Sequence, residues 1–453
     1  MDSKGKKELF YVDFLQGPIA RSLLIFTIPI LISNIFQQFY NMADTIIVGH
    51  FLGDQALAAI GAASVLYDLL VGFALGIGNG LAVVTARCFG SGDMHYLKKS
   101  VASSLCIGLI SSVLITVAGG MSLKPLLELL NTPAEILEES YSYVSVIVWF
   151  TIVMFAYNLC AAMLRAIGNS IMPLVFLIFS SVVNVGLDIL FISKFSMGVR
   201  GAAVATVIAQ GISVVLCLVY IWKHAKILLP EKEHFTYEKD LYAELAGQGL
   251  SMGLMGSIVS TGTVILQYGI NGFGTLVIAG HTAARKIQAF LGMLFGTTAT
   301  AIATFSSQNR GAGQRERIVK ANKYLYSYDL VACVVISALL IFTAKPLVRL
   351  VSGSNEPVVI ENAVLYLRVA SPFYGILGVL VQTRCALQGL GEKLIPLISS
   401  VIEFFGKILF VVLFIPRFEY MAVIFCEPVI WCIMTVQLVY AFYTNPFIRG
   451  KKN

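Results

Sequence analysis

Long apolar segments separated by short polar loops recur from Arg21 to Tyr443. Many of them reach about twenty residues, the length that a helix needs to cross the hydrocarbon core of a bilayer. In lipid the backbone polar groups must bond within their own segment, so these segments are predicted to be helices. Twelve helices are expected, starting near residues 19, 55, 97, 137, 169, 198, 241, 277, 320, 359, 394 and 420.

The second half of the chain repeats the first. Gly53–Gly92 aligns without gaps on Gly274–Gly313, so a single constant offset relates the two segments. The same offset pairs residues 124–126 with 345–347, both Lys-Pro-Leu, and after a two-residue slip 173–174 pairs with 396–397, both Pro-Leu. Collinear matches that include Gly, Pro and Lys indicate a true internal repeat.

The repeat predicts an all-α polytopic membrane protein with twelve transmembrane helices in two homologous six-helix lobes. The longest polar stretch, residues 223–240, reads as a cytoplasmic linker between an N-lobe at 1–222 and a C-lobe at 241–453. Each copy crosses the membrane six times and therefore has the same topology. Such copies are expected to be related by an axis along the membrane normal, a plan used by transporters.

Composition agrees with a lipid environment. Only 13% of the residues are charged and 57% are hydrophobic, whereas about 25% of the residues of a soluble domain are charged. The 32 Lys and Arg residues lie mostly at the termini and in the even-numbered connections. The positive-inside rule then predicts a protein of the cell (inner) membrane with both termini in the cytoplasm. The net charge of +7 is spread over loops, so no nucleic-acid partner is expected.

Several kinds of chemistry have no visible place in the sequence. No G-x-x-x-x-G-K-[ST] motif occurs, and the eight cysteines form no C-x-x-C pair. Gly76 and Gly80, with Gly72 at the same four-residue spacing, suit close packing of helices better than a nucleotide-binding loop. We expect neither an enzyme nor a bound cofactor.

One polar face stands out on the first predicted helix. Gln37, Tyr40, Asn41 and Asp44 follow the i, i+3, i+4, i+7 spacing of a helix face. Ionisable side chains within membrane spans are costly and by default indicate function. Asp44 could alternate between a protonated and an ionised state. The alternative is a polar anchor near the outer end of the helix.

A second polar group lies on the fifth and sixth predicted helices. Asn184 and Asp188 are one turn apart, and Thr206 offers a hydroxyl group. Carboxylate, amide and hydroxyl oxygens are ligands for a small hard cation. The alternative is that Asn and Thr only hydrogen-bond helices together. In the repeat Asn184 aligns with Lys407 and Asp188 with Val411, so the chemistry is confined to one half.

The second half has buried polar residues of its own. Glu403 and Lys407 are four residues apart and are predicted to form an intrahelical ion pair with a structural role. Arg285 could instead face a cavity between the helices and influence which charge a transported substrate can carry. Arg368 and Asp68 receive no role.

Five short segments resemble the multidrug and toxic compound extrusion (MATE) family, and the resemblance covers nearly the whole chain. They are Pro-Ile-Leu-Ile at 29–32 with Asn-Met-Ala-Asp-Thr at 41–45, Phe-Gly-Ser-Gly at 89–92, Leu-Arg-Ala-Ile-Gly-Asn-Ser at 164–170 and Asn-Val-Gly-Leu-Asp at 184–188. The sequence is most similar to the DNA-damage-inducible-protein-like branch. The other major branch uses acidic residues on helices seven and ten, and the cores of those helices contain none here.

The resemblance implies an antiporter whose two lobes enclose a central cavity. It implies an N-lobe site at which H+ or Na+ binds, formed by Asp44, Asn184, Asp188 and Thr206. It also implies export of amphipathic, often cationic, drugs or toxic metabolites by alternating access. The residues expected to line the substrate cavity are Gln37, Tyr40, Asn41, Asn158, Gln267 and Arg285.

Other functions remain open. A lipid-linked saccharide flippase of the same superfamily would be favoured by a large basic cavity. An integral-membrane enzyme would need a catalytic cluster that the short loops do not offer, and the two-fold repeat favours rocking over a fixed channel. The expected partners are small amphipathic substrates and membrane lipids. A monomer is expected because one chain contains both lobes.

Overall fold

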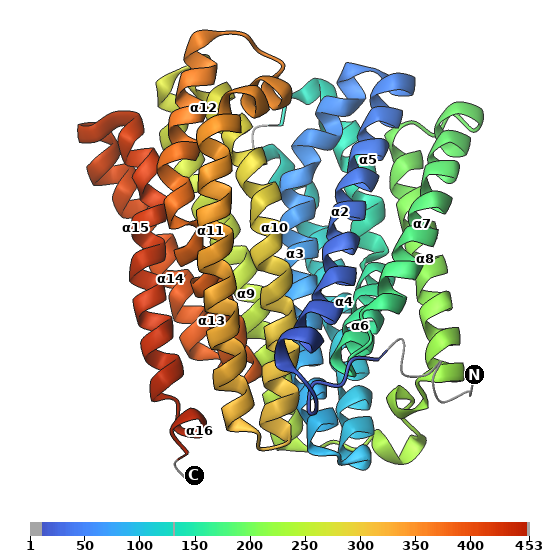
Figure 1. The fold of residues 1–453 in the computed structure, drawn as a ribbon. Helices are drawn as coiled ribbons and strands as arrows, with labels where there is room; N and C mark the ends of the chain where they lie inside the picture. Colours follow the sequence, from blue (N-terminus) through green and yellow to red (C-terminus); the bar gives the residue numbers. More distant parts are fainter. Residues whose placement is uncertain (1–10, 130–131, 451–453) are drawn as a thin grey trace, which may run out of the picture. The chain divides into compact units, whose positions relative to one another are not determined.

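The computed structural model describes residues 11–129 and 132–450, and this part of the chain contains helices and no strand (Figure 1). Ten helical stretches within it are long and apolar enough to cross a membrane, or eleven when a pair bent by 52° counts as one span. The last stretch, Leu394–Thr444, has 51 residues, whereas one crossing needs about twenty. Its backbone breaks at Glu419 (φ 50°, ψ −136°). With the bent pair counted as one span and Leu394–Thr444 counted as two, the described residues contain twelve spans. The predicted all-α fold is confirmed.

The helices of the first half begin close to the predicted positions. Their bounds are α2 Ile19–Leu52, α3 Asp54–Ser91, α4 Met94–Leu129, α5 Ala134–Trp149, α6 Thr151–Ala166, α7 Ile171–Ile189 and α8 Val199–His224. A π-helical turn, Leu190–Lys194, continues α7, and two 3₁₀ turns, Lys226–Leu228 and Lys232–His234, follow α8.

The second half has the same order of elements. The bounds are α9 Lys239–Ile270, α10 Thr275–Gly311, α11 Arg315–Ser352, α12 Pro357–Ala370, α13 Tyr374–Gly389, α14 Leu394–Leu409, α15 Ile415–Thr444 and α16 Pro446–Arg449. Two 3₁₀ turns, Asn271–Phe273 and Ser371–Phe373, and a π-helical turn, Phe410–Phe414, complete it.

Helix boundaries reproduce the internal repeat. The first residues of α3 and α10 are separated by the offset found in the sequence, and those of α4 and α11 by the same offset. For α5 and α12, and again for α7 and α14, the separation is larger by the two-residue slip, which therefore lies before α5 and α12. In both halves the fourth span is interrupted, by the bend between α5 and α6 and by the turn between α12 and α13. A π-helical turn follows both α7 and α14.

Contacts between Cα atoms divide the chain into two compact units. Unit 1 comprises Met1–Asp13 and Ile28–Gly256, and unit 2 comprises Phe14–Thr27 and Ser257–Asn453. These units are defined by packing. The internal repeat instead predicts two lobes, at 1–222 and 241–453, with a linker at 223–240, and this division remains a prediction. The predicted cytoplasmic termini fall on residues 1–10 and 451–453, outside the described part of the chain.

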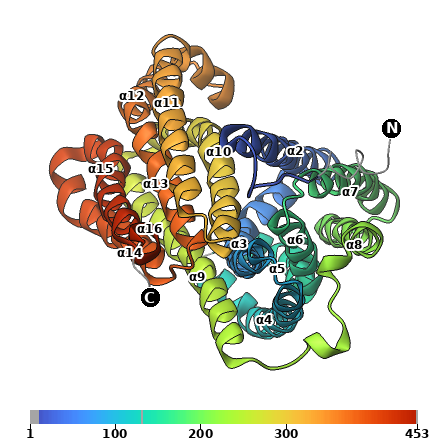
Figure 2. The ribbon, with the colours of Figure 1, turned by 60° about the horizontal axis from the view of Figure 1, so that its bottom comes forward.

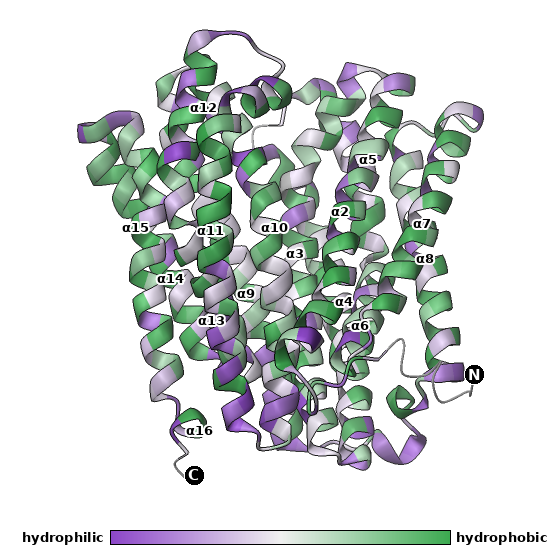
Figure 3. Cartoon of the chain, viewed as in Figure 1, coloured by the Kyte–Doolittle hydropathy of each residue, from purple (hydrophilic) through white to green (hydrophobic). Residues whose placement is uncertain are grey.

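Hydrophobic residues predominate in the middle of the helices, and hydrophilic residues are more frequent toward the helix ends (Figure 3). Apolar residues exposed at 50% or more occur on α4 and α11, such as Leu114 and Phe342. This distribution fits a lipid solvent, in which exposed apolar surface carries no penalty. The chain is a multi-pass membrane protein.

Unit 1 contains one especially close helix pair, α3 against α9. A Cβ atom built on Gly76 would lie 2.6 Å from Gly253 Cα, and one built on Gly80 would lie 2.6 Å from Gly249 Cα. The predicted role of this glycine stripe in helix packing is confirmed for these two residues. A Cβ atom on Gly72 would meet nothing within 4 Å, so Gly72 is not part of the contact. Viewed toward the helix ends, α3 also lies beside α5 and α6 (Figure 2).

Candidate functional site

Three helices of unit 1 bring the predicted cation ligands together. Asp44 lies on α2, Asn184 and Asp188 on α7, and Thr206 on α8. Asp188 is 0% exposed, Asn184 1% and Thr206 6%, while Asp44 is half-buried. Because α7 packs along α8, residues on the two helices become neighbours.

Thr206 is the hub of a hydrogen-bond chain between the three helices. Its hydroxyl group donates to the Ala202 carbonyl oxygen, one turn back on α8, at 3.1 Å. Asn184 Nδ2 donates to Thr206 Oγ1 at 3.4 Å, and the Tyr40 hydroxyl lies 3.2 Å from the same oxygen. The single Thr206 proton is used on Ala202, so Tyr40 is the donor. Both lone pairs of Thr206 Oγ1 are then occupied, and in this conformation Thr206 positions Tyr40 and Asn184 rather than offering an oxygen to a cation.

The acidic side chains present the opposite situation. The carboxyl groups of Asp44 and Asp188 interact with each other directly. Asp188 Oδ1 and Oδ2, Asp44 Oδ1 and Asn184 Oδ1 are all buried, and each has no hydrogen-bond donor within the described residues. Two ionised carboxylates in contact repel each other unless a proton or a cation lies between them. Four acceptor oxygens without donors are a suitable ligand set for H+ or Na+.

Two backbone features occur on the helices that carry these acceptors. The α7 helix changes to π-helical geometry at Leu190, two residues after Asp188. Such turns leave backbone carbonyl groups in altered positions and often lie at functional sites. On α2 the ring of Pro29 removes one backbone donor, and Ser33 Oγ donates to the Pro29 carbonyl oxygen at 2.8 Å. α2 nevertheless runs without a break from Ile19 to Leu52.

Two tyrosines near the acidic pair were not predicted. Tyr67 on α3 and Tyr143 on α5 lie close enough to Asp44 for an electrostatic interaction with its carboxyl group. Tyr143 is 9% exposed. Both phenol groups could donate a hydrogen bond to an ionised carboxylate. The sequence of either helix alone does not distinguish these tyrosines from aromatic core residues, because their nearness to Asp44 depends on tertiary packing.

The residues predicted for the substrate cavity are divided between the units. In unit 1, Gln37 and Asn41 are exposed on α2. Asn158 Nδ2 donates to the Met154 carbonyl oxygen at 2.8 Å, and Asn158 and Tyr67 line a small cavity of about 10 Å³, room for about one water molecule. In unit 2, Gln267 Nε2 donates to Asn271 Oδ1 at 2.8 Å. Their role in substrate binding stays a prediction.

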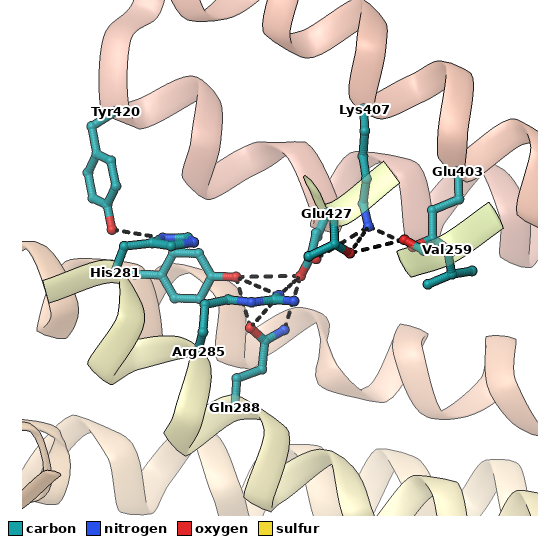
Figure 4. A network of polar contacts seen from close by, with 10 residues as sticks. Val259, His281, Arg285, Gln288, Glu403, Lys407, Tyr420 and Glu427 are labelled. Atoms are coloured by element: carbon teal, nitrogen blue, oxygen red, sulfur yellow. Dashed lines mark hydrogen bonds and ion pairs between the residues drawn. The ribbon is translucent and has the colours of Figure 1, made fainter. Parts of the chain in front are cut away.

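Arg285, the sixth predicted cavity residue, belongs to a polar network in unit 2 (Figure 4). Its Nη1 atom lies 2.5 Å from Glu427 Oε2 on α15 and 3.1 Å from Gln288 Oε1 on α10. Gln288 Nε2 donates to the same Glu427 oxygen at 3.2 Å, and the Tyr366 hydroxyl donates to Gln288 Oε1 at 2.8 Å. Arg285 is therefore held in place, with one-third of its side chain exposed.

Lys407 joins this network to α14. Lys407 Nζ lies 2.9 Å from Glu403 Oε1, which confirms the predicted intrahelical ion pair. The ammonium group also lies 3.9 Å from Glu427 Oε1 and 3.1 Å from Thr263 Oγ1. Arg384 Nη2 approaches Glu403 Oε2 at 3.9 Å. Three cationic and two anionic side chains thus share the network, which leaves one positive charge in excess.

One other group of residues could be taken for a metal site. Potential ligand atoms of His95, Glu233 and His234 lie within 4.8 Å of one another, the only such group found within the described residues. The backbone N–H of Glu231 donates to His234 Nδ1 at 3.0 Å, so the neutral ring carries its proton on Nε2. The protonated Nε2 cannot bind a metal while this hydrogen bond stands, and the acceptor oxygens of unit 1 are the better candidate for a cation site.

Known proteins resemble the chain along most of its length. The MatE family model matches residues 29–190 and 251–413. Probable multidrug resistance protein YpnP of Bacillus subtilis is 27% identical over 392 residues, covering 86% of this chain and 87% of that protein. A protein of Shewanella oneidensis described as an FAD transporter is 26% identical over 385 residues, or 83% of each chain.

Solved structures share the fold. An outward-facing conformation of a multidrug resistance MATE family transporter of the MOP superfamily superposes with a TM-score of 0.88 at 21% identity, covering 98% of each chain. A MATE structure in a bent conformation gives a TM-score of 0.85 at 21% identity, covering 97% of this chain and 98% of the other. The two stretches matched by the family model correspond to the two copies of the repeat.

Proposed function

Because the chain belongs to the MatE family of multidrug and toxic compound extrusion transporters, we propose that it exports amphipathic, often cationic, compounds in exchange for a coupling cation. As a member of this family it is a transporter and not an enzyme. The similarity to proteins described as multidrug resistance proteins supports the substrate class. The lobes, a monomeric state and a cell-membrane location with cytoplasmic termini belong to the same proposal.

The observation that carries the proposal is the contact between Asp44 and Asp188 in unit 1. Their buried acceptor oxygens have no donor within the described residues. A proton shared between the carboxyl groups, or a sodium ion bound by them with Asn184 Oδ1, would remove the repulsion. The site is therefore suited to an ion that enters and leaves.

Coupling follows when the ion binds one orientation of the transporter more tightly than the other. Ion binding draws Asp44 on α2 toward Asp188 on α7, and ion release lets the two carboxylates separate. The hydrogen bond from Tyr40 to Thr206 places a second connection on the same face of α2. Movement of α2 against α7 and α8 is thus the step that the ion controls.

Unit 2 offers no equivalent for a mobile ion at the repeat position. Lys407, the counterpart of Asn184, carries its own positive charge and pairs with Glu403 at 2.9 Å, with Glu427 at 3.9 Å. A tethered ammonium group stands where unit 1 would hold a free cation. This difference supports a single coupling site in unit 1.

The proposal is tested by efflux of a cationic dye such as ethidium from proteoliposomes under separately imposed proton and sodium gradients. Wild type should transport with one gradient, and Asp44→Asn and Asp188→Asn should lose gradient-driven transport. Asp68→Asn is the matched control, because Asp68 is an exposed acid on α3 outside the site. Equal transport by wild type and Asp188→Asn would reject the site, and no transport under either gradient would reject the function.

A second candidate is export of organic anions. The excess positive charge of the unit 2 network, with Arg285 one-third exposed, could attract a carboxylate or phosphate group. One relative is described as an FAD transporter. In the same proteoliposomes, counterflow of flavin nucleotides that ethidium does not inhibit would favour this substrate class.

A further inference from the structure

A basic pocket lies in unit 2 where α11 ends and α12 begins. Its volume is about 500 Å³, and its polar lining includes Lys345, Arg349 and Arg368 with one carboxylate, Glu361. Three cationic groups against one anionic group leave two positive charges in excess. The rest of the lining is largely apolar and includes Val364 and Leu365.

The basic residues of the pocket have no anionic partner in the part of the chain that the structure describes. Within the described residues, no ion pair involves Lys345, Arg349 or Arg368. Arg368 Nη2 donates to the Ile341 carbonyl oxygen on α11 at 2.8 Å, which fixes its side chain between the two helices. That contact satisfies one of five guanidinium donors and neutralises no charge.

The position of Arg368 makes this lack of a partner costly. Arg368 lies about three helical turns after Pro357, the first residue of α12, or about 16 Å along a helix. At that level α11 exposes the apolar side chains of Ile341 (54%) and Phe342 (81%). A guanidinium group beside lipid-facing apolar residues needs an anion or water to compensate its charge.

The other copy of the repeat provides a comparison inside the same chain. Lys124, the counterpart of Lys345, lies 3.1 Å from Glu138. In the same ungapped alignment Glu128 takes the position of Arg349. The first copy therefore balances its lysine with the protein's own carboxylates. The second copy keeps the carboxylate of Glu138 as Glu361 but has Arg349 in place of Glu128, so its positive charge exceeds its negative charge.

We propose that this pocket binds the phosphate group of an anionic membrane phospholipid. Arg349 and Lys345 are one helical turn apart on α11, so both can contact one phosphate, and Arg368 continues the row of positive charge toward the apolar level. The acyl chains lie against Val364 and Leu365. Glu361 can accept a hydrogen bond from a hydroxyl-bearing headgroup, which makes phosphatidylglycerol the best match.

Native mass spectrometry of the full-length protein in detergent tests this, with phosphatidylglycerol and phosphatidylcholine of identical acyl chains. Wild type should retain phosphatidylglycerol preferentially. Each removed charge should weaken binding about fivefold, so Lys345→Gln with Arg349→Gln should weaken it about 25-fold. Lys124→Gln should bind the lipid like wild type, because the partner of Lys124 is a protein carboxylate. Lys345→Arg keeps the positive charge and should keep the affinity for phosphatidylglycerol. A loss of binding in Lys345→Gln alone is then due to the lost charge and not to misfolding.

Three results would overturn the proposal. Equal retention of phosphatidylcholine would show that lipid charge is irrelevant. An equal loss of binding in Lys124→Gln would show that the pocket is not the site. Displacement of the lipid by millimolar inorganic phosphate would assign the pocket to a free anion.

Discussion

Tyr40 on α2 donates a hydrogen bond to Thr206 on α8 at 3.2 Å. Tyr40 lies one helical turn before Asp44 on α2. Thr206 receives a second bond from Asn184 on α7, so one hydroxyl group on α8 connects the two helices that carry the acidic pair. The arrangement separates two roles. Thr206 and Tyr40 fix the geometry, whereas the oxygens of Asp44, Asp188 and Asn184 remain open to an ion.

Tyr40→Phe and Thr206→Val should each slow transport, because each removes the hydroxyl bond between α2 and α8. Their effects on stability should not add. A double-mutant cycle should give a coupling free energy of about 0.6 kcal/mol, typical of interhelical hydrogen bonds in membranes. Thermal unfolding in detergent measures this. Tyr440→Phe, at a tyrosine that is 72% exposed, should change neither transport nor unfolding, and fully additive effects of the first two variants would argue against the bond.

Gly76→Ala and Gly80→Ala should each destabilise the protein by about 3 kcal/mol, because a methyl group would strike the α9 backbone at 2.6 Å. Gly72→Ala is the control on the same helix. Its new methyl group meets nothing within 4 Å, and alanine favours the helix by up to about 1 kcal/mol. Melting temperatures should fall for the first two variants and hold or rise for the third. A similar decrease in all three would mean that the close approach of α3 to α9 is not the cause.

Glu427→Gln should destabilise unit 2 strongly, because Arg285 and Lys407 both lose a carboxylate partner. Breaking a buried ion pair costs about 3 kcal/mol or more, and the low end applies here because Arg285 is partly exposed. Glu138→Gln removes the carboxylate from the exposed pair with Lys124 and should change stability little, because solvent screens exposed ion pairs. Chemical or thermal unfolding compares the two variants. An equally small effect in both would show that the network does not stabilise unit 2.

Local features were predictable from the sequence. The Glu403–Lys407 pair was predicted because its residues are four apart on one helix, a distance fixed by helix geometry alone. The helix starts and the repeat also followed from local patterns, since apolar length and collinear Gly, Pro and Lys positions need no tertiary information.

Contacts between distant spans were not predictable in the same way. Glu427 and Arg285 are 142 residues apart, and nothing in either helix indicates which face meets the other. Tyr67 and Tyr143 look like core aromatics until α3 and α5 are placed beside α2. The full hydrogen bonding of Thr206 is likewise a tertiary property, because it depends on Tyr40 from another helix. The assignment of the branch within the family stays a prediction.

In the proposed mechanism the Asp44–Asp188 pair binds the coupling ion, and binding of the substrate releases this ion. The most direct measurement is ion exchange on substrate binding: ethidium is added to purified protein in weakly buffered detergent, and proton release is followed by a pH indicator, with bound ²²Na⁺ counted in parallel. Wild type should release one of the two ions, and Asp188→Asn should release neither while Asp68→Asn behaves like wild type. Undiminished ion release from Asp188→Asn would contradict the claim.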